Sequence, residues 1–172
     1  SVIRSGMRSG YINPSASTNG TFGPGDPVTL AQLAKVAHKI ANIDESIYHE
    51  EPRNSRARGT WFADFYASAE SRYWAVYRDP MDAPERPATR SEVVCTLLQA
   101  LDVPRLWPKG NTFSDVTPIT PYADCIETAA TDGLITGDQT SRTFGPERPV
   151  NRAELAKMLV TASELYGERT KE

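Results

Sequence analysis

The sequence is poor in the residues that build metal sites, and it has no excess of positive charge. Its 172 residues include two cysteines and two histidines. Neither Cys95 and Cys125 nor His38 and His49 have the close spacing of zinc ligands, so we expect no metal and no cofactor. Nineteen Lys and Arg stand against 22 Asp and Glu, a net charge of −3. This balance argues against a nucleic-acid partner, because phosphate backbones are bound by concentrated positive charge.

Long apolar runs and catalytic motifs are also absent. The longest mainly apolar stretch, near residues 93–101, is far shorter than the roughly 20 residues that a helix needs to cross a bilayer, so we expect no membrane span. There is no nucleophile elbow and no phosphate-binding glycine loop, and we therefore expect no enzyme. Cys95 and Cys125 lie beside apolar neighbours. Two buried thiols are the preferred interpretation, and a disulfide between units is the alternative.

What the chain does contain is one helix start that occurs three times. In each copy a Thr or Asn can cap the helix while a Gln or Glu three residues later reaches back to the amide of the cap, which is a reciprocal capping box. The pairs are Thr29 with Gln32, Thr89 with Glu92, and Asn151 with Glu154. Residues 21–35 and 143–157 align without a gap and are identical at ten of fifteen positions. The repetition predicts a protein of three related units.

The third unit, residues 112–167, is the most complete. Its apolar spacing predicts a helix over 121–131, a stop at Gly133, and a second helix from Asn151 to about Tyr166. A polar loop joins the two helices. This helix-loop-helix plan is the template for the other two units.

The first unit covers residues 1–43 and the second covers 60–106, and the polar segment 44–59 is expected to be a surface linker. The first helix of the first unit, with Ile3, Met7 and the stop Gly10, is cut short, so we expect the chain to be a piece of a longer protein. One helix pair cannot bury its own apolar faces, whereas three pairs can share a core. We therefore expect an all-α protein with a common core formed by the second helices.

Five segments together form a recognisable pattern: Phe113-Ser-Asp115-Val116, Gly133-Leu-Ile-Thr-Gly137-Asp138, Thr-Phe144-Gly-Pro146, Val150-Asn-Arg152-Ala-Glu154 and, in the middle unit, Thr89-Arg90-Ser91-Glu92. This pattern resembles the S-layer homology (SLH) family. The resemblance covers nearly the whole chain, strongly in the third unit and weakly in the middle one. It implies three repeats in a pseudo-threefold arrangement around a central helical bundle, which attaches proteins non-covalently to bacterial cell-wall polysaccharide, at the cell surface or in the S-layer.

The resemblance also implies a ligand and a site. Family ligands are secondary wall glycans, commonly with a pyruvyl ketal on N-acetylmannosamine, held in grooves between units by the motif Arg, glycine backbone, and acidic or aromatic residues. The residues implied here are Arg90, Arg152, Gly133, Gly137, Asp138, Asp115, Trp61, Glu92 and Glu154.

Physical reasoning points to the same arginines. Arg90 and Arg152 each take the first helical position, where unpaired backbone amides and a guanidinium together would receive a carboxylate. Leu30 takes this position in the first unit, so at most two such sites are expected.

Each site residue also has a purely structural interpretation. Arg90 would pair with Glu92 or with a loop acid, the glycines would be helix stops and turns, and the two aspartates would be turn residues. Trp61, on an apolar stripe, would lie mostly in the core. A different function also stays open, in which the chain is a structural S-layer or scaffold protein that acts through protein–protein contacts. Retention on wall glycan would favour anchoring, whereas ordered self-assembly without glycan would favour the scaffold.

Overall fold

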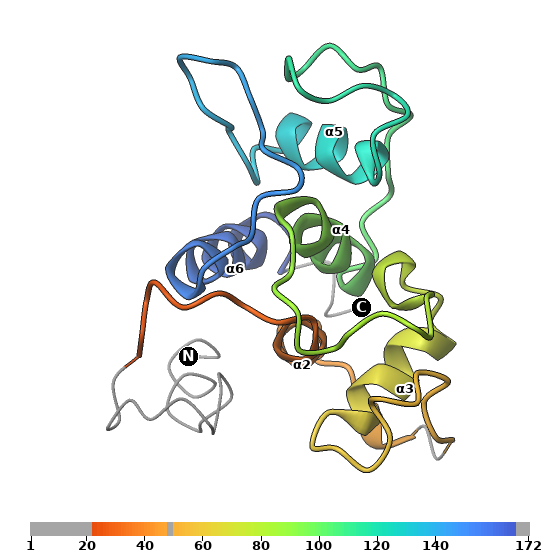
Figure 1. Ribbon diagram of the computed structural model, residues 1–172. Helices are drawn as coiled ribbons and strands as arrows, with labels where there is room; N and C mark the ends of the chain where they lie inside the picture. The colour runs from red at the N-terminus through yellow and green to blue at the C-terminus, as the bar shows by residue number, and fades with distance from the viewer. Residues whose placement is uncertain (1–21, 48–49, 168–172) are drawn as a thin grey trace.

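The computed structural model describes residues 22–47 and 50–167, and this part of the chain is helical, without a β-sheet (Figure 1). This confirms the all-α prediction. No helix within the described ranges is long and apolar enough to span a bilayer. The helices are α2 (Leu30–Ile40), α3 (Ala63–Ser71), α4 (Arg90–Ala100), α5 (Ala123–Thr131) and α6 (Arg152–Tyr166), with short 3₁₀ turns at Glu45–Ile47 and Ala75–Tyr77.

All three predicted capping boxes are present. In α2 the Thr29 hydroxyl accepts a hydrogen bond from the Gln32 amide at 3.3 Å, and the Gln32 side chain accepts one from the Thr29 amide at 3.1 Å. The same reciprocal pair starts α4 and α6. Each cap stabilises its helix by roughly 1 kcal/mol. The sequence signal was reliable because both partners lie within one helical turn.

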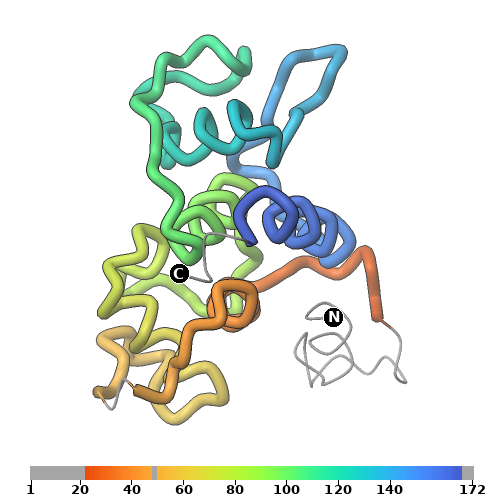
Figure 2. Tube along the Cα trace, turned by 180° about the vertical axis from the view of Figure 1, so that it is seen from behind, coloured from red at the N-terminus to blue at the C-terminus, as the bar shows by residue number. Residues whose placement is uncertain are grey.

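The three segments before these caps hydrogen-bond to one another in a closed ring. The Val28 amide donates to the Val150 carbonyl at 2.9 Å, the Val150 amide to the Ala88 carbonyl at 3.1 Å, and the Ala88 amide to the Val28 carbonyl at 2.8 Å. All three residues are buried. The ring brings the starts of α2, α4 and α6 together, and these helices lie in the middle of both views with α3 and α5 outside them (Figures 1 and 2).

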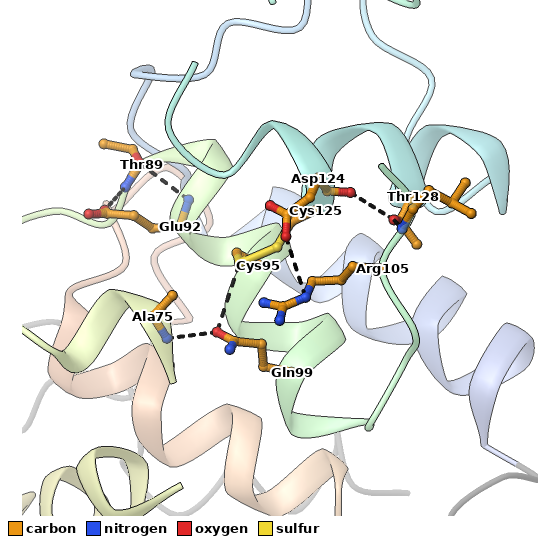
Figure 3. Close-up of a disulfide and its surroundings, with 10 residues drawn as sticks. Ala75, Thr89, Glu92, Cys95, Gln99, Arg105, Asp124, Cys125 and Thr128 are labelled. Atoms are coloured by element: carbon orange, nitrogen blue, oxygen red, sulfur yellow. Dashed lines mark hydrogen bonds and ion pairs between the residues drawn. A yellow bond between two sulfur atoms is a disulfide. The ribbon is translucent and has the colours of Figure 1, made fainter. Parts of the chain in front are cut away.

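Helix α4 packs against α2 and α5 and carries much of the core, including Val93, Val94, Leu97 and Leu98. Cys95 of α4 is disulfide-bonded to Cys125 of α5, with their Cα atoms 5.0 Å apart, and an Arg105–Asp124 ion pair lies beside the bond (Figure 3). The preferred interpretation of two separate thiols is therefore wrong, and the alternative of a disulfide between units is correct. Local apolar patterns show that a cysteine is buried but not which residue faces it.

The segment 44–59, expected to be a surface linker, is partly inside the fold. Asn54 and Ala57 are buried. The Asn54 amide donates to Glu70 at 3.1 Å, and its side-chain amide donates to the Asp82 carbonyl at 2.8 Å. An irregular polar segment can be buried when such partners satisfy it, and periodicity does not detect this. The first helix predicted for the first unit, with Ile3, Met7 and Gly10, lies outside the described residues.

Candidate functional site

A groove between the second and third units contains three of the residues expected in the site. Its hollow measures about 230 Å³ and lies between the start of α4, the segment that follows α5, and one face of α6. Arg90, Gly133 and Glu154 meet there. The remaining lining residues are Leu134, Ile135, Thr136, Lys157, Met158 and Thr161. We call this hollow the Arg90 groove.

Arg90 is a partly buried cation that forms no ion pair with any of the described residues. Its guanidinium carbon lies 4.8 Å from the centre of the Phe144 ring, and within the described residues its buried Nε has no acceptor. Burial lowers the pKa of Arg90, and the neighbouring Arg148 lowers it further, while Glu154 acts in the opposite direction. A cation held this way favours an incoming anion, because part of its own desolvation is already complete.

The alternative in which Arg90 pairs with Glu92 is wrong. Glu92 is buried, completes the capping box of α4, and forms an ion pair with Arg86 at 2.5 Å. Its carboxylate is therefore fully engaged and does not reach the groove as a ligand residue.

The expectation of unpaired amides at these helix starts is also wrong. The Arg90 amide donates to the Arg148 carbonyl at 2.9 Å and the Ser91 amide to the Pro146 carbonyl at 3.1 Å, while the Glu92 amide is held by the cap. Corresponding carbonyls of other units receive the first amides of α2 and α6. The loop of a neighbouring unit thus takes the place that a bound anion would have taken, and the guanidinium remains as the donor of the groove.

Arg152 occupies the first position of α6, as predicted, but its side chain faces inward. It is 4% exposed. Its Nη1 donates to the Phe22 carbonyl at 2.8 Å and lies 3.1 Å from the Asp26 carboxylate. Arg152 is therefore engaged inside the protein, in contrast to its expected role as a second open ligand residue.

The acidic residues of the third unit have structural partners. Asp115 accepts hydrogen bonds from the Phe144 and Gly145 amides at 2.8 and 2.7 Å. Asp138 accepts from the Ser141 and Thr140 amides, and these bonds lower its pKa. Both match their structural interpretation as loop and turn residues. Asp138 lines a separate shallow hollow of about 290 Å³, with Phe113 and Gly133, outside the Arg90 groove.

Glu154 has two roles. It completes the capping box of α6 and forms an ion pair with Arg148 at 2.6 Å. The hydrogen bond from Arg148 is the main cause of its lowered pKa, so Glu154 stays ionised on the wall of the groove at neutral pH.

The two candidate glycines differ in what surrounds them. Gly133, which follows α5, has φ +81°, and a Cβ added there would meet nothing within 4 Å. Gly137 has φ +65°, and a Cβ would lie 2.4 Å from the Phe113 ring and 2.8 Å from the Thr143 carbonyl oxygen. Both adopt the left-handed region that favours glycine. Gly133 therefore leaves backbone accessible at the groove, whereas Gly137 is needed for packing.

We expect the Gly137→Ala change to destabilise the protein more than the Gly133→Ala change. Each substitution places Ala at positive φ, at a cost of about 1 kcal/mol or more. Only Gly137→Ala adds a clash with Phe113 and backbone, worth roughly 1–3 kcal/mol more. Urea unfolding of the two variants measures the difference. Equal losses of unfolding free energy would contradict the assignment of Gly137 to packing.

Trp61 lies outside the Arg90 groove and is 45% exposed. It comes before α3, which begins at Ala63, and Lys35 Nζ lies 5.2 Å from its ring centre. The interpretation of Trp61 as mostly core is wrong because the apolar stripe was extended beyond the start of the helix. Trp107, on a loop, is 88% exposed.

Sequence analysis missed the polar wall of the groove on α6. Lys157 and Thr161 follow Glu154 by three and seven residues, and this spacing places all three on one helix face. The spacing was available in the sequence as a signal. A larger hollow of about 460 Å³ lies at the opposite end of α4, beside Gln99 and Arg105, and contains none of the expected site residues.

Within the described ranges no three His, Cys, Asp or Glu side chains are grouped so as to hold a metal ion. No curated protein matches the chain. One family matches part of it, the S-layer homology domain, over residues 112–156, which include Asp115, Gly133, Arg152 and Glu154. Domains of this family are in general cell-surface anchoring modules that bind cell-wall polysaccharide. Residues 112–156 of the chain are therefore similar to an S-layer homology domain.

Proposed function

We propose that the chain is a non-covalent anchoring module of a bacterial cell surface, which binds an acidic wall polysaccharide through the Arg90 groove. The observation that carries the proposal is the half-buried guanidinium of Arg90, whose Nε has no acceptor within the described residues. It lies at a hollow of about 230 Å³. A carboxylate on the glycan supplies the missing anion and can accept two parallel hydrogen bonds from Arg.

A pyruvyl ketal is the proposed source of this carboxylate. Lys157 adds a second cation to the groove, and Thr136 and Thr161 are suitable partners for sugar hydroxyls. The open space at Gly133 allows a sugar ring to approach the backbone. The groove thus combines charge for the ketal acid with neutral hydrogen-bonding groups for the ring.

The proposal includes three repeats in a pseudo-threefold arrangement, with units at 1–43, 60–106 and 112–167. The cyclic bonds among Val28, Ala88 and Val150 support it, since each capping segment contacts the other two in the same manner. We further propose binding without catalysis. Glu154 is the carboxylate that lines the groove, and it is held by Arg148 and by its own cap, which removes it from acid–base work.

One observation favours a second function, a scaffold acting through protein–protein contacts. Leu106, Trp107 and Ile119 are exposed on the segment between α4 and α5, with Trp107 at 88% and Ile119 at 92%. An exposed apolar patch is typical of surfaces that contact other proteins, and this alternative proposes that these residues form one. Other surface-layer proteins are the partners that this alternative requires.

The test is retention of the protein by purified wall polysaccharide, with its ketal groups intact or removed by mild acid. We expect retention by the intact glycan and a large loss after ketal removal. Equal retention by both preparations would overturn the acidic-ligand proposal. Ordered self-assembly without any retention would favour the scaffold instead. Incubation with wall fragments is expected to release no sugar, and released sugar would overturn the proposal of binding without catalysis.

A further inference from the structure

Three equivalent backbone positions carry different side chains, and each lies next to the first helical residue of another unit. They are the residues three places before each cap, namely Asp26, Arg86 and Arg148. We call this the gate position. The carbonyl of Asp26 accepts from the Arg152 amide at 3.0 Å, that of Arg86 from the Leu30 amide at 3.2 Å, and that of Arg148 from the Arg90 amide at 2.9 Å. The backbone contact is thus conserved within the chain while the side chain varies.

At the first gate position the side chain is a carboxylate, and it meets a guanidinium. Asp26 Oδ2 lies 3.1 Å from Nη1 of Arg152. A Cβ built on Gly23 would lie against both the Asp26 carboxylate and Arg152 Nη1, so Gly23 lies directly beside the pair, in which Arg152 is buried and Asp26 is partly exposed. Asp26 therefore provides, from inside the protein, the anion that an acidic ligand would bring to Arg152.

At the third gate position the side chain is a cation, so it does not form an ion pair with the arginine of the neighbouring helix. Arg148 lowers the pKa of Arg90, after the effect of burial, and directs its own guanidinium to Glu154 at 2.6 Å. Arg90 keeps the contact with Phe144 but gains no ion pair within the described residues. The second gate residue, Arg86, faces Leu30, which carries no charge, and pairs with Asp82 and Glu92.

The charge of the gate residue varies with the residue at the third position of the helix that follows it. Arg86 and Arg148 each pair with the Glu of their own capping box, Glu92 and Glu154. Where that box contains the neutral Gln32, the gate residue is Asp26. An Arg at the gate is thus turned toward its own helix, whereas the Asp is turned toward the neighbouring arginine.

We propose that the gate residue determines whether the arginine at the start of the neighbouring helix can bind an acidic ligand. Asp26 pairs with Arg152 and so blocks it from a ligand, whereas Arg148 pairs with Glu154 and so leaves Arg90 available. The inference rests on the proposed function and deepens it, because it names the specificity-determining residue of the Arg90 groove. It also makes the Arg90 groove the competent site of the two that the motif arginines suggest.

The test transfers the closed arrangement to the open groove. Arg148→Asp combined with Glu154→Gln reproduces the pair Asp26 and Gln32, and Gln32 shows that Gln supports a capping box. The matched control is Arg148→Ala combined with Glu154→Gln, which loses the same ion pair but adds no carboxylate. The probe is the methyl glycoside of N-acetylmannosamine bearing a pyruvyl ketal, with affinity measured by calorimetry and folding checked by circular dichroism.

We expect the Asp variant to bind this probe about 30-fold more weakly than the Ala control, because an internal carboxylate then competes for Arg90. A second measurement needs no glycan, namely labelling of Arg90 by phenylglyoxal, read by mass spectrometry. Labelling of Arg90 is expected in the Ala control and strong protection in the Asp variant. Equal labelling of Arg90 in both variants would overturn the proposal that the gate residue controls access to Arg90. If the probe binds neither the wild type nor any variant while the labelling still differs, the gate stands and the proposed ligand is wrong.

Discussion

Replacing Arg90 with methionine is expected to weaken binding to ketal-bearing wall polysaccharide by about 100-fold. Removal of one member of a desolvated charge pair typically costs 2–5 kcal/mol, and Arg90 is the half-buried cation of the groove. Methionine has a similar length and preserves apolar contact with the Phe144 ring, so that the loss reports the charge rather than the packing. The measurement is calorimetric titration of the glycan into each protein.

The same variant should unfold no more easily than the wild type. The buried Nε of Arg90 has no acceptor among residues 22–47 and 50–167, and burying such a group is unfavourable for folding. Arg90→Lys serves as the control, since it retains the positive charge but loses the planar fork, and its affinity should fall between those of the wild type and Arg90→Met. A methionine variant that binds the glycan normally, or one that unfolds far more easily, would show that Arg90 has a structural role.

Removing the disulfide is expected to have the largest effect on stability. Cys95 and Cys125 are 30 residues apart in the sequence, and closing a loop of that length stabilises a protein by about 3–4 kcal/mol. For a chain of this size the loss corresponds to a fall in Tm on the order of 10 °C. The variant Cys95→Ala with Cys125→Ala should show this fall in a thermal scan without reductant.

Reductant provides the matched control for that scan. It should lower the Tm of the wild type toward that of the double variant and leave the double variant unchanged. The bond joins α4, which begins at Arg90, to α5, which ends two residues before Gly133. Reduction should therefore also weaken glycan binding modestly, by loosening two walls of the Arg90 groove. A wild-type Tm that does not respond to reductant would contradict a structural role for the bond.

The features that sequence analysis predicted well are local ones. The caps at Thr29, Thr89 and Asn151 were correct because donor and acceptor lie three residues apart. The left-handed stop at Gly133 and the placement of Arg90 and Arg152 at first helical positions follow from the same short-range rules. Such geometry needs no knowledge of the rest of the chain.

The features that it missed depend on contacts between units. The amide of Arg90 is satisfied by Arg148, and the side chain of Arg152 by Asp26, each across a long sequence separation. The pairing of Cys95 with Cys125 is of the same kind. The prediction for Trp61 was wrong for a different reason, because the apolar periodicity extends to residues that precede the first residue of α3. Tertiary context decides these positions, and one sequence does not reveal it.

The closed ring formed by Val28, Ala88 and Val150 has a consequence for how such a module is divided or extended. Each of the three residues donates one hydrogen bond and accepts one. Removing any one of them therefore leaves a buried amide without an acceptor on one of the remaining two residues and a buried carbonyl without a donor on the other. We therefore expect that the smallest piece that folds contains all three capped helix starts. If the chain anchors to a wall as proposed, tighter attachment requires further complete sets of three, because a fourth copy appended singly finds no open hydrogen-bonding position in the ring.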